Sequence, residues 1–254
     1  MKRLLVIGIG AGDPEQLTVQ AVKALNRADL FFLLDKGAGT SALLDLRRAI
    51  CERYVEDRAY RVVEARLPER ARDVADYAAS VAALNAAKQA LFERLIDEAM
   101  ADGECGAFLV WGDPSLYDST LRILDAIIAG GRHAIEYEVI PGISSVQALT
   151  ARHRVPLNRI GGAVQITSGR RLAQSGMPDG VDDLVVLLDA QDAYARLLGQ
   201  GLEIFWGAYL GTADEILIAG PLDEVAERIR DTRQRAREVH GWIMDTYLLR
   251  RREG

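Results

Sequence analysis

The sequence predicts an α/β protein of two α/β domains, the first with a mostly parallel sheet and the second with a mixed sheet. Short apolar runs alternate with helical patterns through the first half of the chain, as is typical of buried parallel strands. After about Leu157 the apolar runs follow at closer spacing, which favours a mixed sheet. The 254 residues suffice for two hydrophobic cores. We therefore predict domains over residues 1–157 and 158–254.

The first domain opens with an apolar strand that runs into a glycine-rich turn. Two helix starts are then possible: Asp13 caps a helix that begins at Pro14, or Thr18 caps a helix over "VQAVKALNRAD". A long Ala-rich helical pattern later in the domain is closed by Asp102-Gly103. The predicted strands are 3–9, 30–34, 60–66, 106–111 and 135–140, and the further helices are 41–54, 74–100 and 119–129.

In the second domain, five strands are separated by two clear helices. The strands are predicted at 163–168, 183–190, 202–211, 215–220 and 241–249, and the helices near 191–199 and 222–239.

Composition excludes several classes of protein. A net charge of −6 argues against a nucleic-acid partner. Cys51 and Cys105 stand at neither metal nor redox spacing, which suits a reducing cytoplasm. The three histidines are too scattered to predict a metal site. Because no apolar run approaches ~18 residues and the first run is cut by glycines, we expect a cytoplasmic protein without a membrane partner.

The opening stretch "LLVIGIGAGDPEQLT" looks at first like the start of a dinucleotide-binding domain. The fingerprint G-x-G-x-x-G, counted from Gly8, has Asp13 in place of its third glycine, and counted from Gly10 it has Glu15. A carboxylate there would repel a phosphate at a helix start. This argues against a nicotinamide-dependent dehydrogenase, an alternative that binding of NAD would revive.

Three loops carry the clearest signal for a ligand site. They cover residues 8–13, 112–117 and 141–145, and each follows a predicted strand of the first domain. The carboxyl ends of parallel strands share one edge of a sheet, where ligands bind, and glycine permits close approach to the backbone. Any one loop alone would be interpreted as an ordinary tight turn. The three together predict a binding site.

The wording of these loops, "GIGAGDPEQLT", "GDPSLY" and "PGISS", resembles the tetrapyrrole methylase family. Ala11 is a departure, because many members carry proline there. The resemblance implies the tetrapyrrole methylase fold, with S-adenosylmethionine bound in the cleft between the domains and S-adenosylhomocysteine as product. A sulfonium cation without a phosphate is compatible with the carboxylates of Asp13 and Asp113.

The resemblance also implies which residues bind this cofactor. Ser144 and Ser145 are expected to hold its polar end through hydroxyl and backbone groups. Leu188 and Gly211 rest on the shorter matches "VVLLDA" and "YLGT", and buried strand core is an equal alternative for Leu188. The full set is Ala11, Trp111, Gly112, Asp113, Leu116, Ser144, Ser145, Leu188 and Gly211.

Longer stretches, such as "FLVWGDPSLYDSTLRIL" and "GWIMDTYLLRR", are most similar to the branch of the family that methylates carbon 1 of precorrin-5 in cobalamin biosynthesis. That branch releases acetate and forms precorrin-6A. This chain has Leu84-Asn85 where the branch often has Trp-His.

Two alternative functions stay open. The first is a methyltransferase of the same fold with another acceptor, such as another precorrin, a modified histidine on a protein, or RNA, which the net charge disfavours. The second is a relative that binds the donor without catalysis. Family members are commonly homodimers, so we expect one here.

For the chemistry, methyl transfer mainly needs alignment of donor and acceptor, whereas deacetylation needs an activated water. Asp113 and Asp35 are candidate general bases, and Tyr117 is a candidate to polarise a carbonyl. For Asp113, capping of its loop or contact with the donor's ribose is the preferred alternative.

The implied substrate is a tetrapyrrole with many carboxylates, so cations are expected near it. The candidates are Lys36, Arg152 with His153, Arg159, and Arg170 with Arg171, and of these Lys36 and Arg170 are favoured. The arginines of the tail, 250–252, are expected to be solvated surface.

Overall fold

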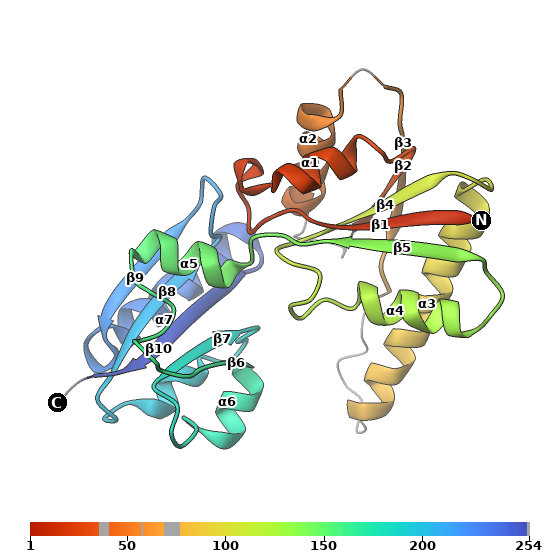
Figure 1. Ribbon diagram of the computed structural model, residues 1–254. Coiled ribbons are helices and arrows are strands. Elements are labelled where there is room, and N and C mark those ends of the chain that lie inside the picture. The colour runs from red at the N-terminus through yellow and green to blue at the C-terminus, as the bar shows by residue number, and fades with distance from the viewer. Residues whose placement is uncertain (36–40, 57, 69–76, 253–254) are drawn as a thin grey trace. The chain divides into compact units, whose positions relative to one another are not determined.

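The computed structural model describes residues 1–35, 41–56, 58–68 and 77–252, and the chain forms two compact units (Figure 1). Unit 1 comprises Met1–Gly10 and Pro14–Ile143, and unit 2 comprises Ala11–Asp13 and Ser144–Gly254. The division predicted after residue 157 stays a prediction. None of the helices described is long and apolar enough to cross a membrane.

Unit 1 is built on a parallel sheet with the strand order β3-β2-β4-β1-β5. The central strand β1 pairs with β4 on one side and with β5 on the other, with Val6 opposite both Phe108 and Val139. The predicted parallel sheet is confirmed. Its strands are β1 (Lys2–Gly8), β2 (Leu30–Asp35), β3 (Arg61–Arg66), β4 (Cys105–Val110) and β5 (Ile135–Ile140).

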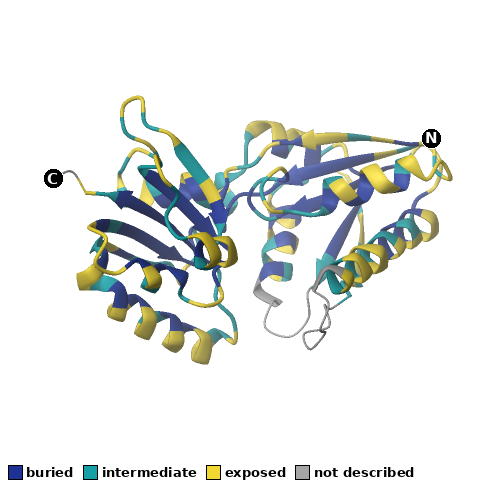
Figure 2. Cartoon of the chain, turned by 90° about the horizontal axis from the view of Figure 1, so that it is seen from below, coloured by how far each residue is buried: buried dark blue, intermediate teal, exposed yellow. Residues whose placement is uncertain are grey.

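Helices cover both faces of this sheet, because alternate side chains of a strand point to opposite faces. Leu5 and Ile7 pack on the side of α1 and α2, whereas Leu4 and Val6 pack on the side of α3 and α4. Figure 2 shows the resulting pattern of buried strands and helices with exposed outer faces. The helices are α1 (Val19–Leu25), α2 (Ser41–Tyr54), α3 (Tyr77–Ala99) and α4 (Thr120–Ala129).

The second of the two predicted helix starts is confirmed. The Thr18 hydroxyl accepts the N–H of Ala21 at 3.0 Å and caps α1. The other prediction, an α-helix that begins at Pro14, was wrong, because only the three-residue 3-10 helix η1 (Pro14–Gln16) follows Asp13.

Unit 2 has the strand order β6-β7-β10-β8-β9, in which β6 and β7 are parallel and the other pairs antiparallel. The predicted mixed sheet is confirmed. Helix α5 packs on β8 and β10. The elements are α5 (Ser145–His153), β6 (Val164–Ser168), α6 (Gly169–Ser175), β7 (Asp183–Leu187), η2 (Ala193–Leu197), β8 (Leu202–Ala208), β9 (Ile216–Pro221), α7 (Leu222–His240) and β10 (Asp245–Arg251).

Several details of unit 2 differ from prediction. Strands β7 and β8 end at Leu187 and Ala208 rather than at residues 190 and 211. Helix α6, which Ser168 caps by accepting the N–H of Arg171 at 3.4 Å, was not predicted. The helix predicted near 191–199 is the 3-10 turn η2. Strand β10 begins at Asp245 rather than residue 241, because Gly241 has a φ of +73° and ends α7 in a left-handed cap.

The expectation for the tail was wrong at Arg250. This side chain is buried, and its Nε lies 2.5 Å from Oδ1 of the fully buried Asp183. It also donates to the carbonyl of Pro156 at 2.8 Å. A buried charge needs such partners, and Arg250 therefore belongs to the frame of unit 2.

Candidate active site

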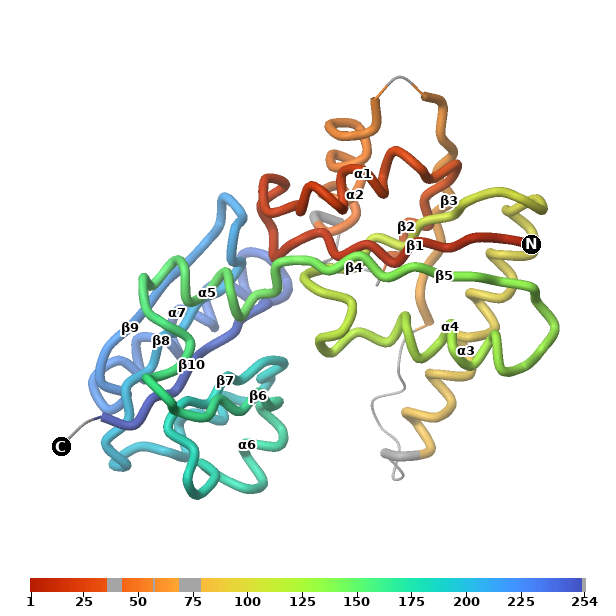
Figure 3. Tube along the Cα trace, in the orientation of Figure 1, coloured from red at the N-terminus to blue at the C-terminus, as the bar shows by residue number. Residues whose placement is uncertain are grey.

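The three predicted ligand loops follow β1, β4 and β5, which are neighbours in the parallel sheet. The structure therefore brings the ends of these strands together at one edge. Gly10 and Gly112 form an isolated antiparallel bridge, with Gly112 N to Gly10 O at 2.8 Å and Gly10 N to Gly112 O at 3.3 Å. The chain passes from unit 1 to unit 2 within two of these loops, at Ala11 and at Ser144. Figure 3 traces the neighbouring strands β1, β4 and β5 that precede the loops.

Glycine is required here because the loops touch one another. A Cβ on Gly142 would lie 2.2 Å from the carbonyl oxygen of Gly112, and a Cβ on Gly8 would lie 2.6 Å from the nitrogen of Gly142. Gly112 also has a φ of +69°, which other residues rarely adopt. The glycines thus fix the packing of loop on loop before any ligand is considered.

Asp113 joins two of the loops. Its carboxylate accepts the N–H of Gly142 at 2.9 Å, the N–H of Ser115 at 2.8 Å and the Ser115 hydroxyl. Partial burial alone would raise the pKa of Asp113, but the hydrogen bonds from Ser115 and Gly142 lower the pKa below its ordinary value. The side chain is therefore ionised at neutral pH and already engaged in holding the loops.

In unit 2, the two predicted serines occupy the start of α5. Ser144 is its N-cap and accepts the N–H of Val146 at 3.1 Å, while Gln147 accepts the N–H of Ser144 at 3.1 Å. This is a capping box. The Ser145 hydroxyl accepts a hydrogen bond from the Thr246 hydroxyl at 3.0 Å, which connects α5 to the start of β10.

Leu188 directly follows β7 and is not strand core, so that alternative is wrong. Its side chain is 65% exposed, and its φ is +55°. Thr246, the partner of Ser145, pairs with Leu187 in the β7–β10 ladder. Ser145 and Leu188 therefore lie at the same end of the unit 2 sheet.

Gly211 also has a positive φ, +78°. Its N–H donates to Glu215 at 2.9 Å, and the same carboxylate lies 2.5 Å from the guanidinium of Arg152 on α5. A Cβ on Gly12 would lie 2.4 Å from the carbonyl oxygen of Leu210. The segment 11–13, which contains the candidate Ala11, therefore packs against the turn that holds Gly211.

The chemistry of the loops suits a ligand that is not a phosphate. Residues 8–13, 112–117 and 141–145 contain no Lys, Arg or His. They offer carbonyl oxygens, hydroxyl groups and the carboxylates of Asp13 and Asp113, a set of groups that favours a cation. Within the described ranges, no group of His, Cys, Asp and Glu could hold a metal ion.

The sequence model of the tetrapyrrole (corrin/porphyrin) methylase family matches residues 3–226 of this chain. The chain belongs to this family. Precorrin-6A synthase (deacetylating) of Sinorhizobium sp is 49% identical over 251 residues, which cover 99% of this chain and 96% of that protein. The predicted family resemblance is thus confirmed.

Solved structures confirm the predicted tetrapyrrole methylase fold. A cobalamin synthesis related protein of Corynebacterium diphtheriae matches over the full length of both chains, with 38% identity and a TM-score of 0.83. Uroporphyrin-III C-methyltransferase of Thermus thermophilus, solved with S-adenosylhomocysteine, shares the fold at 21% identity and a TM-score of 0.59, covering 97% of this chain and 91% of that one.

The other candidate residues of this tetrapyrrole methylase differ in their surroundings. Tyr117 has a φ of +53° and is 47% exposed, and partial burial raises its pKa. Trp111 and Leu116 are half-buried. Arg170 is exposed and follows β6, the parallel neighbour of β7. Lys36 lies outside the described residues.

Arg47 is a buried cation of this methylase that the sequence analysis did not single out. Arg47 on α2 donates to the carbonyls of Leu109 at 3.0 Å and Leu43 at 3.1 Å. Burial lowers the pKa of Arg47, and the charges of Asp118 and Asp35 partly offset this. The candidate base Asp35 is therefore close to a cation. Nothing in the amphipathic pattern of residues 41–54 distinguishes Arg47 from its neighbour Arg48.

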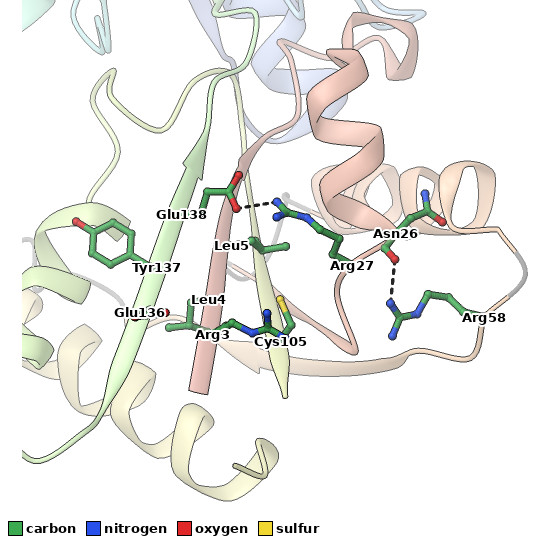
Figure 4. Close-up of a pocket in the computed structure, with 10 residues that line it drawn as sticks. All are labelled: Arg3, Leu4, Leu5, Asn26, Arg27, Arg58, Cys105, Glu136, Tyr137 and Glu138. Carbon is green, nitrogen blue, oxygen red and sulfur yellow. Dashed lines mark hydrogen bonds and ion pairs between the residues drawn. The ribbon is translucent and has the colours of Figure 1, made fainter. Parts of the chain in front are cut away.

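A hollow of about 450 Å³ lies at the opposite edge of the methylase's first sheet, near the amino ends of β1 and β4 (Figure 4). Two of the three arginines that line it are already engaged: Arg27 lies 2.8 Å from Glu138, and Arg58 donates to the carbonyl of Asn26 at 2.9 Å. Ligands of parallel sheets bind at the carboxyl edge. The loops, and not this hollow, therefore stay the candidate site.

Proposed function

We propose that this chain is an S-adenosylmethionine-dependent C-methyltransferase of cobalamin biosynthesis. It methylates precorrin-5 at carbon 1 and releases acetate, giving precorrin-6A. The observation that carries the proposal is the 49% identity to a precorrin-6A synthase (deacetylating) over almost the whole of both chains. The departure at Leu84-Asn85 lies on α3, where Leu84 is half-buried and Asn85 exposed.

The cofactor site that we propose is made of the loop residues described above. The absence of basic side chains from the three loops supports a sulfonium ligand, and a neighbour of the same fold was solved with S-adenosylhomocysteine. S-adenosylmethionine supplies an activated methyl group when bound. The residues proposed to hold it are Ala11, Trp111, Gly112, Asp113, Leu116, Ser144, Ser145, Leu188 and Gly211.

The protein's part in methyl transfer is to hold donor and acceptor in line, because the macrocycle carbon is itself nucleophilic. For deacetylation, Asp113 is a poor base, since its oxygens already accept three hydrogen bonds and its pKa is lowered. Asp35 is the better candidate to activate water. We propose that Tyr117, protonated at neutral pH, donates to a carbonyl of the substrate, and that Arg170 meets substrate carboxylates.

The test is a single-turnover reaction of the purified chain with precorrin-5 and methyl-labelled S-adenosylmethionine. We expect one labelled methyl group and one acetate per macrocycle. Methylation without acetate would point to another acceptor or acceptor carbon. Tight donor binding with no methyl transfer to any precorrin would instead identify a non-catalytic relative.

We also propose a cytoplasmic homodimer. Cys51 and Cys105 are both buried and unpaired, which suits a reducing compartment. Light scattering coupled to size exclusion tests the assembly, with a mass of twice 27.9 kDa expected and a monomer mass contradicting it.

A further inference from the structure

Leu188 is held in a backbone conformation that leucine does not favour. Its φ is +55°, and its side chain projects largely into solvent directly after the buried strand β7. A left-handed conformation costs a residue with a Cβ roughly 1–2 kcal/mol. An exposed apolar side chain gains nothing from burial that could offset this cost. The conformation must therefore be imposed by the residues that follow.

The next residue, Asp189, is fixed by several hydrogen bonds. Its carboxylate accepts the N–H groups of Gln191 at 3.0 Å and Ala193 at 2.7 Å and the hydroxyl of Tyr247 at 2.7 Å. Burial raises the pKa of Tyr247 well above its usual value, so the hydroxyl keeps its proton and donates. A Cβ on Gly169 would lie 2.5 Å from the Asp189 Cα, which shows how closely the start of α6 packs on this residue.

Arg233 of α7 holds the backbone of the same turn. Its guanidinium donates to the carbonyl of Asp189, pairs with the carboxylate of Asp192 and lies 2.9 Å from that of Asp245. The side chain is 1% exposed. Asp192 is also left-handed, with a φ of +54°. The buried guanidinium of Arg233 thus holds the turn 188–192 through two of its residues, Asp189 and Asp192.

We propose that Tyr247 and Arg233 are positioning residues of the donor site: acting through Asp189, they hold Leu188 in the left-handed, exposed conformation in which it contacts the bound donor. This inference rests on the proposed function, because Leu188 is there a donor-binding residue. Neither Tyr247 nor Arg233 touches the donor in this account. Their effect on binding passes through the conformation of Leu188.

The first experiment uses Leu188→Gly, which relieves the strain and removes the side chain. We expect the melting temperature to rise by about 1–3 °C, while the Kd for S-adenosylhomocysteine rises about tenfold. Arg154→Gly is the matched control, because Arg154 is also exposed and left-handed, with a φ of +56°, at the end of α5. It should raise the melting temperature similarly and leave the Kd unchanged. A Leu188→Gly variant that binds as tightly as the wild type would overturn the proposal.

The second experiment tests the buried network through Tyr247→Phe, since removing Arg233 would leave unpaired buried carboxylates and endanger folding. Phenylalanine keeps the edge contact with Tyr194, whose ring centroid lies 5.6 Å away, and removes only the hydrogen bond to Asp189. We expect the Kd for S-adenosylhomocysteine to rise about fivefold in the wild-type background. In the Leu188→Gly background the same change should leave the Kd unchanged.

This coupling separates positioning from a general loss of stability, which would weaken binding equally in both backgrounds. Equal effects of Tyr247→Phe in the two backgrounds would therefore overturn the proposal. If the wild type binds no S-adenosylhomocysteine, the proposed function fails and this inference fails with it. If the wild type binds and every variant binds equally well, the inference alone fails.

Discussion

Gly112 and Gly142 leave no room between their loops for a side chain. The 2.2 Å from a Cβ on Gly142 to the Gly112 carbonyl is far below any normal contact, and both neighbours are backbone. Asp113 adds a hydrogen bond across the same junction. The candidate site therefore depends on close backbone contact between its loops, which explains why its motifs are rich in glycine.

Gly142→Ala should therefore push the loops apart. We expect the free energy of unfolding to fall by about 1–3 kcal/mol, as overpacking does, and the affinity for S-adenosylhomocysteine to fall with it. Urea unfolding and calorimetric titration measure the two effects. Gly162→Ala is the control, because its Cβ would meet the nearest atoms at an ordinary 3.4 Å. Equal stability of the two variants would contradict the packing argument.

Glu215 offers a test in unit 2. Its carboxylate accepts the N–H of Gly211 and pairs with Arg152. Glu215→Ala should weaken S-adenosylhomocysteine binding about fivefold to tenfold, because the N–H of Gly211 loses its carboxylate acceptor and a net hydrogen bond is worth about 1 kcal/mol. Arg152→Ala should cost less than ~1 kcal/mol, since that side chain is more than half exposed. If the arginine change weakened binding more, the carboxylate would not be the group that matters.

Buried charges could not be predicted from the sequence. Arg250 was expected at the surface because its neighbours are charged, but its partner Asp183 lies 67 residues away. Arg233 sits in a helix rich in exposed arginines, and only the tertiary fold brings it to Asp189 and Asp245. Leu188 was predicted to lie within the strand 183–190, but β7 ends at Leu187, and nothing in "VVLLDA" indicates a left-handed backbone.

Among the elements, α5 joins the serine loop to the second sheet. His153, in its last turn, lies with Nε2 3.0 Å from the carbonyl oxygen of Trp206 on β8, and its ring meets Phe205 edge-on at 5.6 Å. Burial lowers the pKa of His153, which outweighs the opposing effects of the Trp206 carbonyl and Glu215. The folded protein therefore favours the neutral ring.

This gives a pH dependence of definite sign. In the unfolded chain the imidazole has a pKa of about 6.5, so below that pH the unfolded state binds a proton that the folded state resists. The contribution of His153 to the free energy of unfolding is therefore fully present above about pH 6.5. It is lost as the pH falls below that value. We expect the difference in unfolding free energy between the wild type and His153→Gln to shrink from pH 7.5 to 5.5. A difference that stays constant over this range would contradict the assignment.

Long apolar strands were predicted well, and short or irregular elements were not. Among the strands, β4 is buried along its whole length and β1 over most of it, and both were predicted to within one residue at each end. β5 and α2 have the predicted bounds. Helix α6 has seven residues, too few for a periodic pattern, and η2 forms where a full helix was expected. The order of strands in each sheet depends on pairing between distant segments, so it was not available from local patterns.

At the scale of the whole molecule, the chain passes between its two units beside the motifs that identify the family. The changes fall at Gly10–Ala11, Asp13–Pro14 and Ile143–Ser144. The candidate residues divide accordingly: Trp111, Gly112, Asp113 and Leu116 belong to the unit with the parallel sheet, and Ala11, Ser144, Ser145, Leu188 and Gly211 belong to the unit with the mixed sheet. The family motifs predicted the residue types, and the structure supplies the contacts that hold them.

The central claim is that this chain binds S-adenosylmethionine and not a nicotinamide cofactor. Calorimetric titration of the purified protein with S-adenosylhomocysteine, with NADH as the control, tests it most directly. We predict micromolar binding of S-adenosylhomocysteine at one site per chain and no heat of binding from NADH. Absence of S-adenosylhomocysteine binding, or a preference for NADH, would contradict the assignment of the glycine loops to a methyl donor.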